Sequence, residues 1–217
     1  MGLTYRCVFP TPTKENFTVI HLVDDDVAVT DACRFLLESI DCAVTCWNNS
    51  DAFLREANLY EPGVVLLDMR MPGKDGHEVY SELRRLQSTL AVIFLTGHGD
   101  IQMAVEQMKQ GAVDFLEKPV SAPSLFASLN KANTLSAAAF HRYVIQQRYN
   151  SLTPKEQAIA LRVIQGDMNK TIAQQLNIAI RTVEVHRARV MEKLGARSLA
   201  ELVTTLQDLN RTTISMF

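Results

Sequence analysis

The stretch Val64–Gly76, VVLLDMRMPGKDG, decides the fold class of the front half of the chain. Its first four residues are continuously apolar, and β-branched valine is typical of strands. A strand that is apolar on both faces belongs to a parallel sheet with helices on both sides. Asp68 follows this apolar run directly, at the position where the strand is expected to end.

The same pattern recurs on both sides of this stretch. Strands are predicted at Val19–Val23, Ala43–Cys46, Val64–Leu67, Ala91–Leu95 and about Val113–Leu116. Amphipathic segments of helical length alternate with them, at about Val27–Ile40, Ser50–Asn58, Gly76–Gln87, Ile101–Gln110 and Ser124–Lys131. Five strand–helix repeats predict an α/β domain over residues 18–134, with a doubly wound five-stranded parallel sheet.

The rest of the chain has a different organisation. Residues 1–17 contain two prolines and no periodicity, and we expect a flexible leader there. Residues 135–151 are predicted to form a helical linker that continues the fifth helix. An all-α domain of four helices is expected at residues 152–217, beginning at Thr153-Pro154, where threonine caps the helix and proline is its first residue.

Composition and charge narrow the class of protein. The chain has 217 residues, of which 47% are hydrophobic and 21% charged, which excludes a disordered or disulfide-scaffold protein. Residues 1–151 carry 13 Lys and Arg against 18 Asp and Glu, a net −5, whereas residues 152–217 carry 9 against 6, a net +3. An acidic front and a basic back predict two domains with different partners.

Neither a membrane span nor a disulfide framework is expected. No apolar run approaches the roughly 18 to 20 residues that cross a bilayer. The four cysteines lack CxxC spacing, so reduced thiols in a cytoplasmic protein are the simplest interpretation.

Polar residues follow the predicted strands at positions that a parallel sheet brings to one edge. Asp24-Asp25-Asp26 follow the first strand, Asp68 the third, Thr96 the fourth and Lys118 the fifth. Ligands bind beyond the carboxyl ends of such strands. Clustered carboxylates repel each other unless a cation is present, and Mg²⁺ favours carboxylate and phosphate oxygens. This edge therefore predicts a site for phosphoryl transfer, in which an aspartate can be the nucleophile.

The segments VIHLVDDD, VVLLDMRMPGKDG, IFLTGHGD and AVDFLEKP resemble, in order and spacing, the motifs of receiver domains of bacterial response regulators. The resemblance covers about residues 18–134 and implies a flavodoxin-like fold with Asp68 as the phospho-acceptor. It also implies a Mg²⁺ site formed by the acidic pair Asp24 and Asp25, by Asp68 and by the Arg70 carbonyl. Thr96 and Lys118 are implied as contacts to the phosphoryl oxygens. Thr96 and Phe115 are implied as the switch residues.

The basic C-terminal segment has the pattern of a helix-turn-helix module. Its two helices are predicted at Asn169–Leu176 and Arg181–Leu194, and the second places Val183, Val190, Met191 and Leu194 on one core-facing stripe. From charge alone, an ordinary amphipathic helix remains an alternative. The whole segment from Leu152 to Leu202 also resembles the LuxR-type helix-turn-helix, which together with a receiver indicates the NarL/FixJ class of response regulators.

The resemblance implies a set of DNA-binding residues in this module. The expected contacts to the DNA backbone or to bases are Asn169, Lys170, Arg181, Thr182, Glu184, Val185, His186, Ala188, Arg189 and Lys193. His186 is also open to a structural interpretation, as a histidine hydrogen-bonded to nearby backbone. Ala179 and Ile180 replace the family's usual Ser-Pro at the turn, which weakens the helix cap.

Together these features predict a cytoplasmic two-component response regulator rather than a turnover enzyme. A sensor histidine kinase is its expected partner, and the phosphorylated chain is expected to form a homodimer that binds an inverted repeat in double-stranded promoter DNA. The stretches STLAVIFLTGHGD, MAVEQMKQGAVDFLEKPVS and IAIRTVEVHRARVMEKLGA are most similar to regulators of tetrathionate respiration. Neither spacing nor composition specifies an inducer.

Two alternative functions would each explain only part of the sequence. A haloacid-dehalogenase-type phosphatase would use Asp24 as nucleophile and Asp26 as general acid, but it leaves Asp68 and the basic domain unexplained. A constitutive DNA-binding protein would use its receiver only for protein interaction. The complete acidic set argues against it, because such a domain has no need of those carboxylates.

Overall fold

The computed structural model describes residues 19–97 and 101–214, so the expected leader at residues 1–17 lies outside the described residues. The chain divides into two compact units between Phe140 and His141, and each is considered by itself. Within the described residues, no helix is long and apolar enough to cross a membrane.

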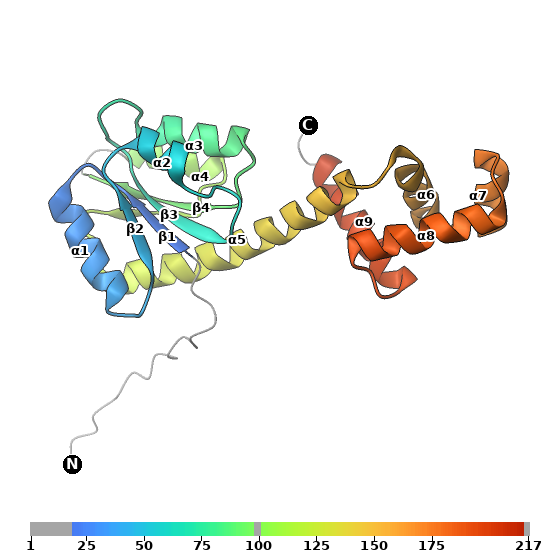
Figure 1. The fold of residues 1–217 in the computed structure, drawn as a ribbon. Coiled ribbons are helices and arrows are strands. Elements are labelled where there is room, and N and C mark those ends of the chain that lie inside the picture. Colours follow the sequence, from blue (N-terminus) through green and yellow to red (C-terminus); the bar gives the residue numbers. More distant parts are fainter. Residues whose placement is uncertain (1–18, 98–100, 215–217) are drawn as a thin grey trace, which may run out of the picture. The chain divides into compact units, whose positions relative to one another are not determined.

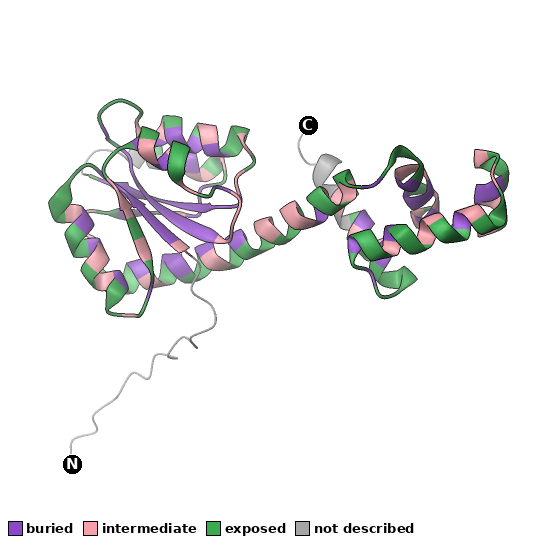
Figure 2. Cartoon of the chain, in the orientation of Figure 1, coloured by how far each residue is buried: buried purple, intermediate pink, exposed green. Residues whose placement is uncertain are grey.

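The first unit is built on a five-stranded parallel sheet in the order β2-β1-β3-β4-β5 (Figure 1). Its strands are β1 (Val19–Val23), β2 (Val44–Trp47), β3 (Gly63–Asp68), β4 (Ala91–Thr96) and β5 (Asp114–Glu117). Central strands β3 and β4 are buried at every residue, as their unbroken apolar runs require (Figure 2). The predicted doubly wound α/β class is confirmed.

Helices cover both faces of this sheet. Helices α1 (Val27–Glu38) and α5 (Ala122–Asn150) pack on one face, and α2 (Ser50–Glu56), α3 (Gly76–Arg85) and α4 (Ile101–Lys109) lie on the other. Successive β3 residues alternate between the two cores: Val64 and Leu66 face the first, and Val65 and Leu67 face the second. This alternation follows from the period of two along a strand.

Helix α5 is longer than the predicted fifth helix and passes the expected domain boundary at residue 134 without a break. Its sequence contains no glycine, and its only proline lies in the first turn, so nothing ends the helix earlier. Beyond that boundary, the Ser136 hydroxyl is still part of the first unit: it donates to the Thr89 carbonyl and accepts from the Gly63 N–H, both at 2.8 Å. The expected linker, residues 135–151, is thus helical as far as Asn150.

The second unit contains helices α6 (Pro154–Ile164), α7 (Asn169–Leu176), α8 (Ile180–Leu194) and α9 (Leu199–Ile214), which confirms the four-helix prediction. Thr153 and Glu156 form a capping box at the start of α6. Val183, Val190 and Leu194 of α8 are buried in a shared core, and Met191 packs against it. Gly195 ends α8 in a left-handed conformation, φ 71°, as a helix-terminating glycine commonly does.

Candidate functional site

The carboxyl ends of β1, β3 and β5 bring three charged side chains into contact. Lys118 Nζ lies 2.6 Å from Asp24 Oδ2 and 2.7 Å from Asp68 Oδ1. Asp24 is 1% exposed and Asp68 6%, so these ion pairs are largely shielded from water. The backbone fixes this arrangement, because Lys118 N–H donates to the Thr96 carbonyl at 2.9 Å and joins β5 to the end of β4.

Charge balance makes this cluster suited to a divalent cation. Ligand oxygens of Asp24, Asp25 and Asp68 all lie within 4.8 Å of one another, and Asp25 is the exposed member. Among the described residues, three carboxylates gather near one ammonium group, that of Lys118, which leaves excess negative charge. Hard cations with oxygen ligands relieve such repulsion. The donor set therefore fits Mg²⁺.

The pKa values of the buried pair are shifted by their surroundings. Burial raises the pKa of Asp68 above the usual carboxyl range, the hydrogen bond from Lys118 opposes this shift, and the charge of Asp24 adds to it. Burial lowers the pKa of Lys118, but its hydrogen bonds to Asp24 and Asp68 raise it by more, so the net shift is upward. The upward shift of the Lys118 pKa favours its charged form, which offsets part of the negative charge of the two carboxylates.

The two expected switch residues lie beside this cluster but differ in exposure. Thr96, at the end of β4, is buried, and its hydroxyl donates to the Leu116 carbonyl at 3.4 Å. Phe115, on β5, is 39% exposed. It lines a surface hollow of about 450 Å³ together with the Lys118-Pro119 segment. A buried hydroxyl and an exposed ring on neighbouring strands are compatible with a coupled movement.

Gly76 supports the site but was not among the expected residues. A Cβ atom at this position would lie 2.3 Å from the Asp68 carbonyl oxygen and 3.0 Å from Met69 Cα. Its N–H donates to the Met69 carbonyl at 3.1 Å, so the start of α3 presses directly on the end of β3. The KDG sequence indicates a turn, but only the packing shows why a side chain is excluded.

Asp26 has a structural partner. Its carboxylate accepts from the Ala28 N–H at 2.8 Å and caps helix α1, and its own N–H donates to Asp24 Oδ1 at 2.9 Å. A cap explains this carboxylate without the general-acid role of the phosphatase hypothesis.

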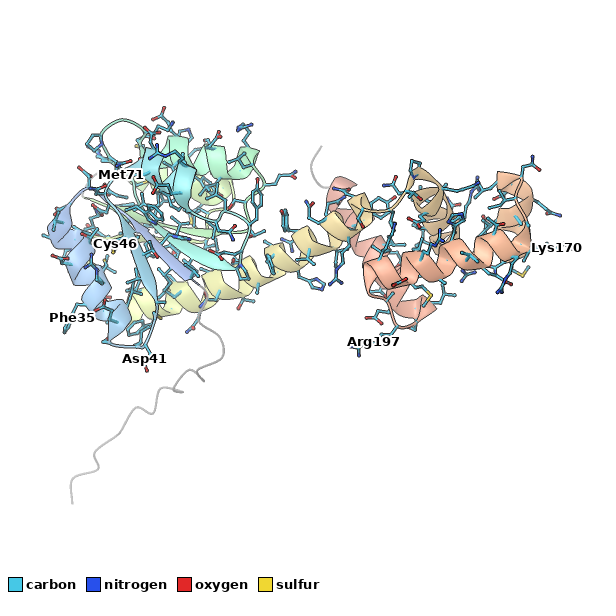
Figure 3. All side chains as sticks on the ribbon, in the orientation of Figure 1. Phe35, Asp41, Cys46, Met71, Lys170 and Arg197 are labelled. Atoms are coloured by element: carbon cyan, nitrogen blue, oxygen red, sulfur yellow. The ribbon has the colours of Figure 1, made fainter. Side chains whose placement is uncertain are left out.

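In the second unit, the expected DNA-binding residues gather on α7 and α8. Val183 is buried beneath them, whereas the side chains that the family pattern assigns to DNA are exposed or half-buried: Asn169, Lys170, Arg181, Thr182, Glu184, Val185, His186, Ala188, Arg189 and Lys193. Lys170 on α7 and Arg197 beyond α8 are labelled in Figure 3, and both are exposed. This unit therefore presents cations to solvent.

Some of these side chains already have partners within the unit. Lys193 Nζ lies 2.7 Å from the buried Glu156 carboxylate and lowers the Glu156 pKa to about 2. Arg181 pairs with Glu184 at 3.1 Å on the surface of α8. Sequence reasoning missed Glu156, although its position three residues after Thr153 is a capping-box signal.

Two further details concern polar groups of α8 and its start. His186 Nδ1 is buried without a hydrogen-bond partner in the described part of the chain. The structure therefore does not show the hydrogen bond to nearby backbone that the structural interpretation of this histidine requires. Ala179 precedes α8 without a side-chain cap, as expected from the missing Ser-Pro.

Comparison with known families agrees with both units. Residues 20–130 match the response regulator receiver domain, and residues 150–206 match the luxR family of bacterial regulatory proteins. The chain belongs to the two-component response regulators. Its two-domain architecture is that of the FixJ/NarL type, so it is a regulator of transcription.

Individual relatives support this assignment. The chain is 60% identical over 190 residues to the tetrathionate response regulatory protein TtrR of Salmonella typhimurium, covering 88% of this chain and 92% of that protein. It is 42% identical to FixJ of Bradyrhizobium diazoefficiens, covering 85% and 92%. The solved structure of the response regulator StyR superposes with a TM-score of 0.65 at 38% identity and covers 88% of this chain and 98% of that one. The expected similarity to regulators of tetrathionate respiration is confirmed.

Proposed function

We propose that Asp68 is the phosphoryl acceptor of this response regulator. The observation that carries this assignment is the buried contact of Asp68 with Lys118 at the end of β3. A carboxylate oxygen of Asp68 attacks phosphorus, the bond to the donor's leaving group breaks, and an acyl phosphate forms. Lys118 and the Thr96 hydroxyl are the proposed contacts to the oxygens of the transferred group.

Mg²⁺ is the proposed cofactor, held by Asp24, Asp25, Asp68 and the Arg70 carbonyl. When bound, this cation neutralises charge on the transferring phosphoryl group. The Asp26 N–H donates a hydrogen bond to Asp24 Oδ1 and holds this carboxylate in place, and Lys118 offsets part of the carboxylate charge. Asp25 remains exposed and accessible to an entering cation.

Phosphorylation is proposed to act through Thr96 and Phe115. The new group adds negative charge and strong acceptor oxygens at Asp68. Thr96 exchanges its long 3.4 Å contact with the Leu116 carbonyl for the phosphoryl group, and the half-exposed Phe115 ring fills the vacated space. The altered surface of α4 and β5 then favours a homodimer, which suits an inverted repeat in DNA.

The DNA contacts proposed for α7 and α8 follow from their exposed charges. The N-terminal residues of a recognition helix meet base edges, and nearby cations meet phosphates. Glu184, Val185, Ala188 and Arg189 are the proposed base-reading residues. The proposed contacts to the DNA backbone are Asn169, Lys170, Arg181, Thr182, His186 and Lys193.

Similarity to TtrR supports tetrathionate respiration genes as the proposed targets. A sensor histidine kinase is the proposed phosphoryl donor, as the receiver domain implies. Binding to bacterial promoter DNA would place this function in the cytoplasm.

Promoter binding with and without phosphorylation tests this function against the constitutive alternative. The wild-type chain is incubated with acetyl phosphate and Mg²⁺, and its affinity for duplex DNA upstream of tetrathionate respiration genes is compared with that of Asp68→Asn. Tighter binding that appears only in the phosphorylated wild type supports the proposal. Equal affinity of both forms would favour a constitutive DNA-binding protein.

A further inference from the structure

The start of α7 is tied to the middle of α8 by one side-chain contact. Arg187 Nη1, on α8, donates a hydrogen bond to Asn169 Oδ1, and Asn169 is the first residue of α7. Both residues are half-buried, at the junction of the two helices. Within the described part of the chain, the partner of Arg187 is this neutral amide and not a carboxylate.

In the part of the chain that the structure describes, no side-chain cap closes α7 or α8 at its start. Met168 precedes α7, and Ala179 precedes α8, and neither side chain accepts a hydrogen bond from the helix. The first turn of α7 therefore lacks the usual side-chain anchor. The contact from Arg187 is the interaction that orients the Asn169 side chain there.

The chemistry of the two groups fixes which way the amide points. A guanidinium group carries only donors, so Asn169 must present its oxygen to Arg187. The amide Nδ2, which is a donor, then points away from Arg187. Phosphate oxygens are acceptors only, so this is the orientation in which Asn169 can bind the DNA backbone.

We propose that Arg187 is a positioning residue for DNA binding, which orients the Asn169 amide as a donor to a phosphate and does not contact DNA itself. The proposal rests on the DNA-binding function proposed above and on the assignment of Asn169 as a backbone contact. Arg187 was not among the residues that the family pattern assigned to DNA. Its positive charge is used inside the protein, unlike that of the exposed Arg189.

A double-mutant cycle on the full-length chain tests this proposal. The probe is one 30-base-pair duplex with an inverted repeat, retained from a randomised pool by the wild-type chain phosphorylated with acetyl phosphate. The dissociation constant is measured over a range of salt concentrations for wild type, Arg187→Ala, Asn169→Ala and the double variant. Arg189→Ala, alone and combined with Asn169→Ala, is the control, and thermal unfolding of each variant measures its stability.

The proposal predicts that each single substitution weakens binding about tenfold and that the double variant is no weaker than either single one, because the two residues act as a unit. The dependence of affinity on salt has the same slope in Arg187→Ala as in Asn169→Ala. Arg187→Lys restores part of the affinity, since an ammonium group can also donate to Asn169 Oδ1. In the control double variant, the losses of affinity caused by Arg189→Ala and Asn169→Ala multiply.

Three results would overturn it. A salt slope lower by about one in Arg187→Ala than in Asn169→Ala would mean that Arg187 itself contacts phosphate. Multiplying effects of Arg187→Ala and Asn169→Ala would mean the same. Unchanged affinity with a lowered melting temperature would make the contact merely structural. Failure of the wild-type chain to retain any duplex would instead overturn the proposed DNA-binding function, and this inference with it.

Discussion

The two units place their functional charges in opposite environments. In the receiver, Asp24 and Asp68 are 1% and 6% exposed and contact a single lysine. In the DNA-binding unit, Lys170, Arg181 and Arg189 are exposed. Buried charges depend on their partners, because an unpaired charge away from water is strongly unfavourable. Exposed charges contribute little to stability and are available to a ligand.

A substitution therefore has different consequences in the two units. A change at the strand ends should affect both the stability of the receiver and its chemistry. A change on the exposed face of α8 should affect binding alone.

Lys118→Met should destabilise the receiver by roughly 3–5 kcal/mol, because it leaves Asp24 and Asp68 buried without their cation. Chemical unfolding monitored by circular dichroism measures the change. Mg²⁺ should stabilise the variant more than the wild type, since it can replace the missing positive charge. An unchanged unfolding midpoint without Mg²⁺ would show that the ion pairs are not shielded from water.

Gly76→Ala should destabilise the receiver by about 3 kcal/mol, because the new Cβ would lie 2.3 Å from the Asp68 carbonyl oxygen. Gly73→Ala is the matched control: nothing lies within 4 Å, and only its positive φ of 80° opposes a side chain, at about 1 kcal/mol. Urea unfolding of the two variants gives the comparison. Equal losses would refute the packing argument.

Glu156→Gln should destabilise the DNA-binding unit by roughly 2 kcal/mol, because Glu156 is the buried partner of Lys193 and completes the cap of α6. Its folded-state pKa of about 2 lies below its ordinary value of about 4.5, so its stabilising effect is present above the ordinary value. That effect is lost as pH falls from about 4.5 towards 2.

Stability of wild type and Glu156→Gln should therefore converge at acid pH, which thermal unfolding against pH can measure. The exposed Glu184→Gln is the control and should change stability little at any pH. A difference between wild type and Glu156→Gln that persists at pH 2 would contradict the assigned role of the ion pair.

Arg189→Ala should leave unfolding unchanged within about 0.5 kcal/mol, because the side chain is exposed. It should weaken specific DNA binding by about 1 kcal/mol through a lost base contact. Fluorescence anisotropy with operator and non-operator duplexes measures the effect. Equal weakening on both duplexes would show that Arg189 contacts phosphate and not a base.

The fold was largely predictable because its signals are local. Apolar runs at Val19–Val23 and Ala91–Leu95 are close to the observed strands, and the order of strands brings Asp24, Asp68 and Lys118 together. The fifth helix and the linker that was predicted to continue it form one helix, α5, because no helix-breaking residue occurs near residue 134.

What the sequence could not supply were contacts between side chains far apart in the chain. The turn motif around Gly76 is visible in the sequence, but the close approach of Gly76 to the Asp68 carbonyl depends on how α3 packs against β3. The Arg187–Asn169 hydrogen bond joins residues 18 positions apart, and no local pattern distinguishes this arginine from one that contacts DNA. For Lys193, the family resemblance implied a contact to the DNA backbone, and only tertiary packing shows its ion pair with Glu156.

The most direct test of the account is the intact mass of the chain after incubation with acetyl phosphate, with and without Mg²⁺, for wild type and Asp68→Asn. The account predicts a gain of one phosphoryl group in wild type that requires Mg²⁺ and is absent in the variant. A gain that persists in Asp68→Asn would show that another residue is the acceptor and would contradict the site assigned to the end of β3.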